Sequence, residues 1–275
     1  MNKDFILEGW DLKKVPSPSF VLHLEMLEEN LKTIDKVRKD AGVEVIMALK
    51  ANATWPIFPL LAEHSDGATA SSLSEARLIA EEMKCKAHIY APVYMEEEFE
   101  EILSYSSHLT FNSLSQWKRY GERAMSAGVS CGLRINPEYS TVDTDLYNPC
   151  SPQSRLGVRR DALTDWPAGI EGLHFHALCE SRPNDLYNIR RAVEEKFGHF
   201  FSSLKWINLG GGHLITHKDY DENVLIEILK DFKSRHPHLR IILEPGSAFT
   251  WDTGVLVSRV EDVLNNGGRN VMMLN

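Results

Sequence analysis

The sequence predicts an α/β protein built on a (β/α)8 TIM barrel. Eight short apolar segments alternate with segments in which apolar residues recur at helical spacing. Polar or glycine-rich residues directly follow several of the apolar segments, as expected where loops leave the strands of such a barrel. Parallel neighbouring strands need a helical crossover, and eight such units close into a ring. With 275 residues, of which 43% are hydrophobic, the chain is long enough for one large core.

The first strand, 45–49, follows a helix predicted over 25–40, in which Leu27, Leu31, Ile34 and Val37 share one face. The following strands are predicted at 68–70, 88–91, 109–111, 131–135, 172–175, 206–209 and 240–243. The helical patterns between them cover 74–83, 96–105, 114–127, 184–200 and 223–235. The count of eight strands favours a closed barrel over an open doubly wound sheet.

Three segments lie outside this repeat. Residues 136–160 form a long loop rich in Pro, Ser, Tyr and Asp, and a loop of this length in a compact domain is usually functional or disordered. Residues 255–257 and 271–274 look like strands separated by the turn signal Asn265-Asn266-Gly267-Gly268. We therefore expect a barrel over 25–246. We expect 247–275 to begin a β-domain that the chain does not complete, with the extended segment 1–24 associating with it.

Composition excludes several functions. The net charge of −9 argues against nucleic-acid binding, which needs clustered Lys and Arg. No apolar stretch approaches the ~20 residues of a membrane span, and the first residues lack the apolar region of a secretory signal, so we expect a cytoplasmic protein. The four cysteines form no CxxC pair, which favours reduced thiols over disulfides or a zinc site.

Lys50 ends the apolar first strand, where a charged amine is costly. Partial desolvation lowers the pKa of a lysine and frees the neutral amine for a Schiff base with an aldehyde such as pyridoxal phosphate. The alternative is a lysine that only marks where a strand emerges into water.

The segments after the last two barrel strands suggest where such a cofactor would bind. Gly210-Gly211-Gly212 could direct backbone N–H groups at a phosphate, at the position where these barrels often bind one. The alternative is a flexible turn. Glu244 could hold a pyridine nitrogen protonated, and Ser247 could donate to phosphate or substrate. Glu244 could instead pair with a basic residue at the rim.

His174 and His176 lie two apart, on one face of a strand. They support a rival hypothesis, a metal-dependent barrel hydrolase, although no acidic cluster stands at convincing spacing. His176 could otherwise lie flat against a cofactor ring. Arg134 is an inward charge that needs an acidic or phenolate partner, and we expect Glu244 or the cofactor.

Five motifs taken in this order resemble the fold type III, alanine-racemase-like pyridoxal phosphate decarboxylases: Ala48-Leu49-Lys50-Ala51-Asn52, Leu133-Arg134-Ile135-Asn136-Pro137, His174-Phe175-His176, Gly210-Gly211-Gly212 and Glu244-Pro245-Gly246. Residues 147–157 and 210–220 are more specific and are similar to the carboxynorspermidine decarboxylase branch. Thr69 and Ser247 stand where ornithine decarboxylase has aspartate and arginine, which fits this branch.

The resemblance implies roles for individual residues and no metal. Lys50 would form the Schiff base, His176 would stack on the ring, Glu244 would contact the pyridine nitrogen, and Arg134 would support that contact. Gly210, Gly211 and Gly212 would bind the phosphate. Ser247, His213, Ser154 and Arg155 are candidates for binding the long cationic substrate.

The implied activity is decarboxylation of carboxynorspermidine to norspermidine, or of carboxyspermidine to spermidine, by a homodimer whose subunits share each active site. Family members take a cysteine and an acidic residue from the partner's β-domain, and the chain stops at Asn275 before such a motif. We therefore assign no proton donor. The alternatives are a diaminopimelate, ornithine or arginine type of decarboxylase, and an inactive regulator that binds pyridoxal phosphate.

Overall fold

The computed structural model describes residues 10–142 and 144–275, and it contains the predicted barrel. Nine strand segments form one parallel sheet in the order β2-β10-β9-β8-β7-β6-β5-β4-β3. β2 (Glu44–Val45) pairs with β10, and β3 (Met47–Ala48) pairs with β4. Because only Ile46 separates β2 from β3, one stretch of chain joins both ends of the sheet and closes the ring. The eight-stranded (β/α)8 barrel is therefore confirmed.

The remaining barrel strands match the sequence prediction to within three residues at each end. They are β4 (Ala68–Ala70), β5 (Ala87–Tyr90), β6 (Ser106–Phe111), β7 (Ser130–Arg134), β8 (Gly172–His174), β9 (Trp206–Asn208) and β10 (Arg240–Leu243). Their apolar side chains are almost completely buried, because a parallel barrel has a filled interior and a layer of helices outside.

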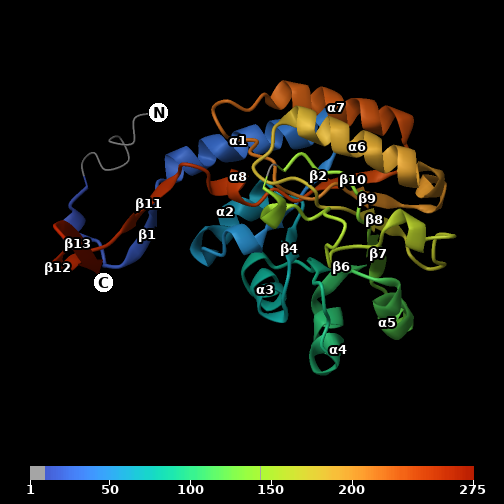
Figure 1. The fold of residues 1–275 in the computed structure, drawn as a ribbon, viewed down its shortest axis with the longest axis horizontal. Coiled ribbons are helices and arrows are strands. Elements are labelled where there is room, and N and C mark those ends of the chain that lie inside the picture. The colour runs from blue at the N-terminus through green and yellow to red at the C-terminus, as the bar shows by residue number, and fades with distance from the viewer. Residues whose placement is uncertain (1–9, 143) are drawn as a thin grey trace.

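The helices form that outer layer (Figure 1). They are α1 (Leu24–Ala41), α2 (Phe58–Glu63), α3 (Leu73–Leu78), α4 (Glu96–Tyr105), α5 (Leu114–Ser126), α6 (Pro183–Phe197), α7 (Glu222–Arg235) and α8 (Ser247–Thr250). α3 continues as a π-helical turn, Ile79–Met83. The face predicted for the first helix is correct, since Leu27, Leu31, Ile34 and Val37 are all fully buried. The short helices α2 and α8 were not predicted.

Trp206 fills the bottom of the barrel. It packs with Ile46 and Ile242, and its indole lies over Gly132 and Gly172. A Cβ at Gly172 would lie 1.9 Å from the indole, so only glycine leaves room for this ring. Trp206 Nε1 donates to Ser130 Oγ at 2.9 Å, which satisfies its polar atom. The barrel is therefore closed at the N-terminal ends of its strands.

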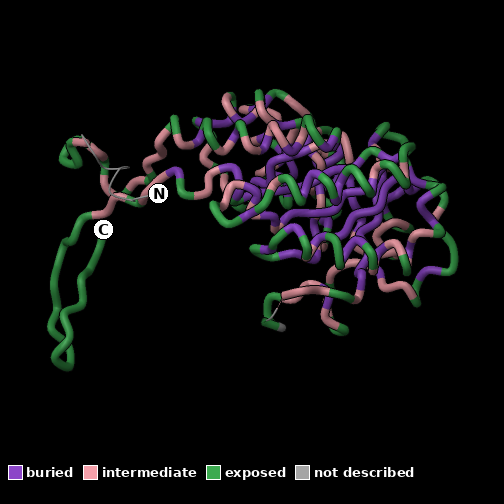
Figure 2. The backbone as a smooth tube through the Cα atoms, turned by 90° about the horizontal axis from the view of Figure 1, so that it is seen from above, coloured by how far each residue is buried: buried purple, intermediate pink, exposed green. Residues whose placement is uncertain are grey.

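The segments around the barrel differ in part from the prediction. β11 (Gly254–Val257) pairs antiparallel with β1 (Ser19–Leu22). The Asn-Asn-Gly-Gly turn joins β12 (Val260–Asn266) to β13 (Arg269–Leu274). The sequence predicted 255–257 as the strand before this turn, and the structure corrects that strand to β12. This hairpin is exposed along its whole length and projects from the barrel (Figure 2).

The domain boundaries stay a prediction, and residues 1–9 of the proposed N-terminal segment lie outside the described residues. Across the described part of the chain, the structure contains no helix with the length and apolar character of a membrane span.

Candidate active site

Lys50 stands at the C-terminal end of the barrel, directly after β3. A single 3-10 turn, Leu49–Ala51, carries it, and the buried Leu49 anchors that turn in the core. A pocket lies here. Six of the polar residues lining it come from five strands or strand ends: Lys50, Tyr90, Arg134, His174, His176 and Glu244. Thr69 of β4, with Ser71 and Glu75 after it, completes the polar lining. Ring closure therefore brings the residues that follow separate strands into one place, as the sequence predicts for a barrel.

Lys50 has the electrostatic surroundings of an amine that can lose its proton. Its side chain reaches solvent at the open mouth, yet crowding by the barrel wall lowers the pKa of the amine. The charge of Arg134 lowers this pKa further, while Glu244 raises it. The net shift is downward, which increases the fraction of neutral, nucleophilic amine.

Glu244, at the end of β10, is 7% exposed, and polar side chains of the site lie against its carboxylate. Asn208 Nδ2 donates to Glu244 Oε1 at 2.6 Å, and His174 Nε2 lies 3.6 Å from Oε2. Burial raises the pKa of Glu244, and the Asn208 hydrogen bond and the Lys50 charge oppose that rise. Asn208 therefore favours the ionised carboxylate in a site that otherwise disfavours it.

The three glycines after β9 lie where three strand ends meet. A Cβ at Gly210, Gly211 or Gly212 would come within 2.4 Å of a backbone carbonyl oxygen from a neighbouring strand end or loop. Gly210 N donates to Asn208 Oδ1 at 2.9 Å, and Gly211 N donates to His176 Nδ1 at 3.2 Å. Backbone packing alone thus requires these glycines.

The two histidines are neutral in this site. Burial lowers the pKa of both His174 and His176 well below 6.5, and the charges of Lys50 and Arg134 add to the shift. Because Gly211 N–H donates to His176 Nδ1, the proton of the neutral ring resides on Nε2. Neither ring nitrogen of the buried His174 has a hydrogen-bond partner within the described chain. Buried polar groups are normally hydrogen-bonded, so a buried ring without such a partner indicates a site where a ligand would supply the hydrogen bond.

The same histidines bear on the metal hypothesis. His174, His176 and Glu244 are the one set of candidate metal ligands in the described residues, with ligand atoms within 4.8 Å of one another. Two cations, Lys50 and Arg134, act on both histidines, and a divalent cation would be repelled by them. The electrostatics therefore favour an anionic ligand over a metal.

Of the two partners expected for Arg134, the structure tests only Glu244, and the contact with the cofactor stays a prediction. Within the described residues Arg134 forms no ion pair with Glu244. Its NH2 group donates to the carbonyl oxygen of His176 at 3.2 Å, and its guanidinium carbon lies 4.6 Å from the centre of the Tyr90 ring. The aromatic face of Tyr90 replaces the expected carboxylate as the neighbour of this cation.

The four candidate substrate residues lie at different depths. Ser247 is exposed at the start of α8, directly after the Glu244 turn. Ser154 and Arg155 lie on the returning limb of the loop 136–160, and Arg155 is exposed. His213 is only 1% exposed, and its Nδ1 lies 3.4 Å from the hydroxyl of Tyr220. The structure thus places His213 within the protein interior, whereas Ser247 and Arg155 reach the surface.

Sequence reasoning missed Asn208 and Tyr90. Asn208 is the last residue of β9, directly before the glycines, and a polar residue at the end of an apolar strand was the available signal. Tyr90 ends β5 in the same way. Both were taken as ordinary strand residues because their partners are distant in sequence.

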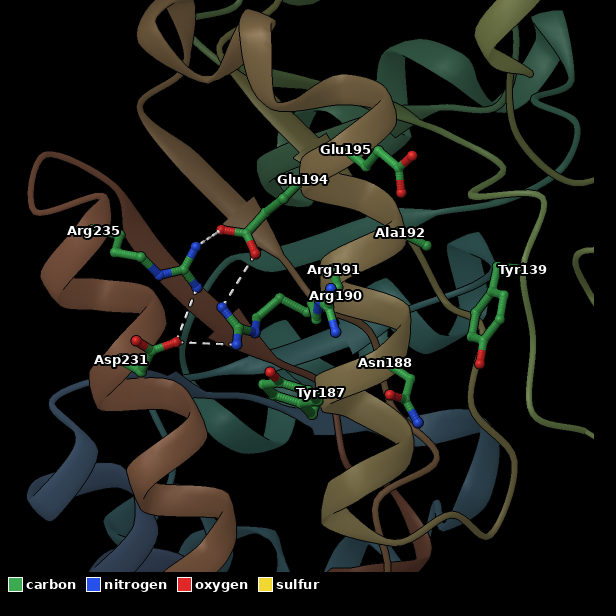
Figure 3. Close-up of a pocket in the computed structure, with 10 residues that line it drawn as sticks. All are labelled: Tyr139, Tyr187, Asn188, Arg190, Arg191, Ala192, Glu194, Glu195, Asp231 and Arg235. Carbon is green, nitrogen blue, oxygen red and sulfur yellow. Dashed lines mark hydrogen bonds and ion pairs between the residues drawn. The ribbon is translucent and has the colours of Figure 1, made fainter.

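A larger hollow lies outside the barrel, on α6 and α7 (Figure 3). It has a volume of about 720 Å3. Arg190, Glu194, Asp231 and Arg235 pair with one another across the two helices, so these charges are already satisfied. We assign the hollow no catalytic role.

The residues at the barrel mouth suit pyridoxal phosphate. A lysine with a lowered pKa, a buried carboxylate held by an amide and a neutral histidine line one pocket. The glycine turn bonds to that histidine, and the buried ring of His174 has no hydrogen-bond partner among the described residues. Residues 24–251 match the family described as "Pyridoxal-dependent decarboxylase, pyridoxal binding domain". The chain therefore belongs to the pyridoxal-dependent decarboxylases, and the family and cofactor expected from the sequence are confirmed.

Individual relatives show which decarboxylases of this family the chain resembles. The chain is 48% identical to the carboxyaminopropylagmatine decarboxylase of Synechocystis over 94% of this chain and 67% of that protein. It is 38% identical to the carboxynorspermidine/carboxyspermidine decarboxylase of Campylobacter jejuni, over 92% and 66%. The crystal structure of the Campylobacter jejuni carboxynorspermidine decarboxylase with norspermidine superposes with a TM-score of 0.85 at 36% identity, covering 94% and 67%. The chain spans about two thirds of the length of these relatives.

Proposed function

We propose that the protein removes the carboxylate from a carboxylated polyamine, with carboxynorspermidine or carboxyspermidine as substrate. The pocket that contains Lys50, His176 and Glu244 is the observation that carries the proposal, because it combines a nucleophilic amine with a buried carboxylate. Two relatives named for these substrates, at 38% and 32% identity, support the choice.

Pyridoxal phosphate, when bound, draws electrons from the carbon that loses its carboxylate. Lys50 would hold the cofactor covalently through its amine, and the lowered pKa of that amine favours the neutral, nucleophilic form. Glu244 would keep a proton on the pyridine nitrogen, since an ionised carboxylate stabilises a neighbouring positive charge. The neutral ring of His176 would pack against the cofactor ring. The turn Gly210–Gly212 would lie beside the phosphate, although the N–H groups of Gly210 and Gly211 already donate within the protein.

A second substrate is favoured by a specific observation. The 48% identity to a carboxyaminopropylagmatine decarboxylase exceeds the identities to the carboxynorspermidine relatives. An agmatine end carries a planar guanidinium in place of a primary amine, so the two substrate types differ in the group at the far end of the chain. Residues that contact that end would distinguish them.

Product analysis tests the proposal. The protein, loaded with pyridoxal phosphate, is incubated separately with carboxynorspermidine, carboxyspermidine and carboxyaminopropylagmatine, and with diaminopimelate, ornithine and arginine as controls. Release of CO2 and of the matching polyamine from one of the first three supports the proposal. Turnover of a control amino acid alone would indicate the related basic amino-acid decarboxylases. Cofactor binding without CO2 from any compound would indicate an inactive regulator.

The covalent attachment is tested separately. Borohydride reduction of the loaded protein, followed by peptide mass mapping, is expected to place the cofactor on Lys50. Attachment to another lysine, or none at all, would contradict the proposed role.

We also propose a homodimer in the cytoplasm. Support for self-association comes from the strands beside the barrel, where Phe20 is 77% exposed and Leu256 57% exposed. Exposed apolar side chains clustered on paired strands are typical of an association surface. Size-exclusion chromatography with light scattering tests the dimer, and a monomer at all concentrations would contradict it.

A further inference from the structure

Asn112 connects the barrel mouth to the long loop 136–160. It follows directly after β6, and its side chain makes three hydrogen bonds. Tyr90 OH and the backbone N–H of Gly157 both donate to Asn112 Oδ1 at 2.8 Å. Asn112 Nδ2 donates to the carbonyl oxygen of Arg155 at 2.9 Å. One amide thus joins a residue of the pocket to two residues of the loop.

The loop rejoins the barrel at one defined position. Val158 N donates to the carbonyl oxygen of Arg134 at 2.9 Å, and Asn136 N donates to that of Val158 at 2.8 Å. Gly157 has a φ of +82°, and a Cβ there would lie 2.7 Å from the carbonyl carbon of Ile135. The limb 154–157 therefore reaches the mouth in a single arrangement. Backbone hydrogen bonds at the end of β7 hold Val158, and Asn112 holds Arg155 and Gly157.

The other partner of Asn112 lies inside the pocket. The ring of Tyr90 packs against the Arg134 guanidinium at 4.6 Å and meets the His174 ring edge-on, with ring centres 5.3 Å apart. Burial raises the pKa of the Tyr90 hydroxyl, and the charges of Arg134 and, more weakly, Arg155 oppose that rise.

We propose that Asn112 is a positioning residue for the substrate, which holds the limb carrying Ser154 and Arg155 at the barrel mouth. The inference rests on the proposed function, because it assigns the loop a part in binding a carboxylated polyamine. Asn112 is not itself a catalytic residue. It sets the position of the loop, and the loop contacts the part of the substrate that extends out of the mouth.

Asn112→Ala removes all three hydrogen bonds to the side chain. We expect KM to rise roughly tenfold, with kcat and the affinity for pyridoxal phosphate changed less than about twofold, because the residues around the cofactor are untouched. We also expect trypsin to cleave after Arg155 roughly ten times faster, since a limb without its anchor opens more often. A general loss of stability would not separate KM from kcat in this way.

Two further variants isolate the effect. Tyr90→Phe removes one hydrogen bond and leaves both loop contacts of Asn112, so the tryptic cleavage rate should stay at the wild-type value. Asn223→Ala is the control for a lost asparagine, because on α7 its Oδ1 accepts from Lys36 Nζ at 2.7 Å, and within the described chain it makes no hydrogen bond with Asn112 or the limb 154–157. It should leave both KM and the cleavage rate unchanged.

Folded Asn112→Ala protein, judged by circular dichroism, with wild-type KM and cleavage rate would overturn the inference. Equal effects of Asn112→Ala and Asn223→Ala would also overturn it, since they would show a general loss of stability. If the wild-type protein releases no CO2 from any candidate substrate, the proposed function fails instead. The cleavage rates still decide whether Asn112 holds the loop.

Discussion

Two clusters of charge in this protein are built in opposite ways. On α6 and α7, Arg190 and Arg235 alternate with Glu194 and Asp231 in a closed ring (Figure 3). Arg190, 2% exposed, lies 3.1 Å from Glu194 and 3.0 Å from Asp231. Each carboxylate meets two guanidinium groups, and each guanidinium meets two carboxylates.

At the barrel mouth the charges are not paired. Lys50 and Arg134 are cations, and the carboxylates lining the pocket are the buried Glu244 and the half-buried Glu75. Among the described residues neither cation forms an ion pair with either carboxylate. A protein interior tolerates unpaired charges only where they serve a function, and an anionic ligand with a protonated ring nitrogen would pair with them. The paired ring therefore indicates a structural role, and the unpaired mouth indicates a functional one. Four experiments test that distinction.

The largest expected effect is at Lys50. Lys50→Ala should lower the rate of decarboxylation by at least about a thousandfold, because the amine that binds the cofactor is lost. It should not lower the unfolding temperature, since it removes a cation from a crowded site. Steady-state kinetics and thermal unfolding measure the two results. Lys36→Ala removes a lysine that is 3.0 Å from Glu222 and serves as the control. A variant without Lys50 that keeps wild-type activity would contradict the proposed site.

The ring on α6 and α7 should show the reverse pattern. Arg190→Met removes the buried cation, so we expect the free energy of unfolding to fall. Glu194 keeps Arg235 and His236 as partners, which limits the expected fall to about 2–3 kcal/mol. The rate per folded molecule should not change. Urea denaturation and kinetics measure these results. Arg235→Ala, at a side chain 42% exposed, should cost less than about 1 kcal/mol. Equal effects of both variants would show that burial does not determine the contribution.

The half-buried His108 provides a third test, through pH. Burial lowers the pKa of His108 from 6.5 to about 4, so the folded protein resists a proton that the unfolded chain accepts. Stability is thus lost as pH falls from 6.5 toward 4. For this one group the loss between pH 8 and pH 5 is about 2 kcal/mol.

The rings of His88 and His108 are stacked, with their centres 3.8 Å apart. His108→Phe keeps an aromatic ring in this position. The variant should lose about 2 kcal/mol less of its unfolding free energy between pH 8 and pH 5 than the wild type does. His199→Phe, at an exposed position, is the control. Decarboxylation at pH 8 should be the same in all three proteins. An unchanged pH dependence in His108→Phe would show that this histidine is not kept neutral by the fold.

The barrel was predictable because its signals are local. The strands 68–70 and 240–243 and the helix 96–105 have the predicted bounds, since runs of apolar residues and helical periodicity occur within each segment. The helix Phe58–Glu63 was missed because it spans less than two turns. The strand Val260–Asn266 was missed because it has no buried face and therefore no alternation to recognise.

The site was predictable only as a set of strand ends. Lys50, His176 and Glu244 follow strands, so ring closure had to bring them together. The contacts between side chains were not predictable in the same way. Arg134 faces Tyr90 and not Glu244, and Asn112 bonds to residues 22 to 45 positions away. Such pairs depend on rotamers and strand register, which no local pattern encodes.

The smallest expected effect is at Asn208, which is 3% exposed. Its side chain connects Glu244, the proposed partner of the pyridine nitrogen, to Gly210 in the proposed phosphate turn. Its Nδ2 donates to Glu244 at 2.6 Å, and its Oδ1 accepts from Gly210 N at 2.9 Å. Asn208→Leu has a similar volume and removes both bonds. Since the amide opposes the burial that raises the pKa of Glu244, its loss raises that pKa further. We expect affinity for pyridoxal phosphate to fall roughly tenfold.

The pH dependence shows how Asn208 acts. With a higher pKa, Glu244 is protonated over a wider range, so the loss of affinity in Asn208→Leu should be larger at pH 6 than at pH 8. Absorbance titrations with pyridoxal phosphate at both values measure it. Asn223→Leu, on α7, is the control for a lost asparagine. An equal loss at both pH values would mean that Asn208 acts only by shaping the glycine turn. The charge of Glu244 would then depend on the two cations Lys50 and Arg134, which also lower its pKa, and not on its amide neighbour.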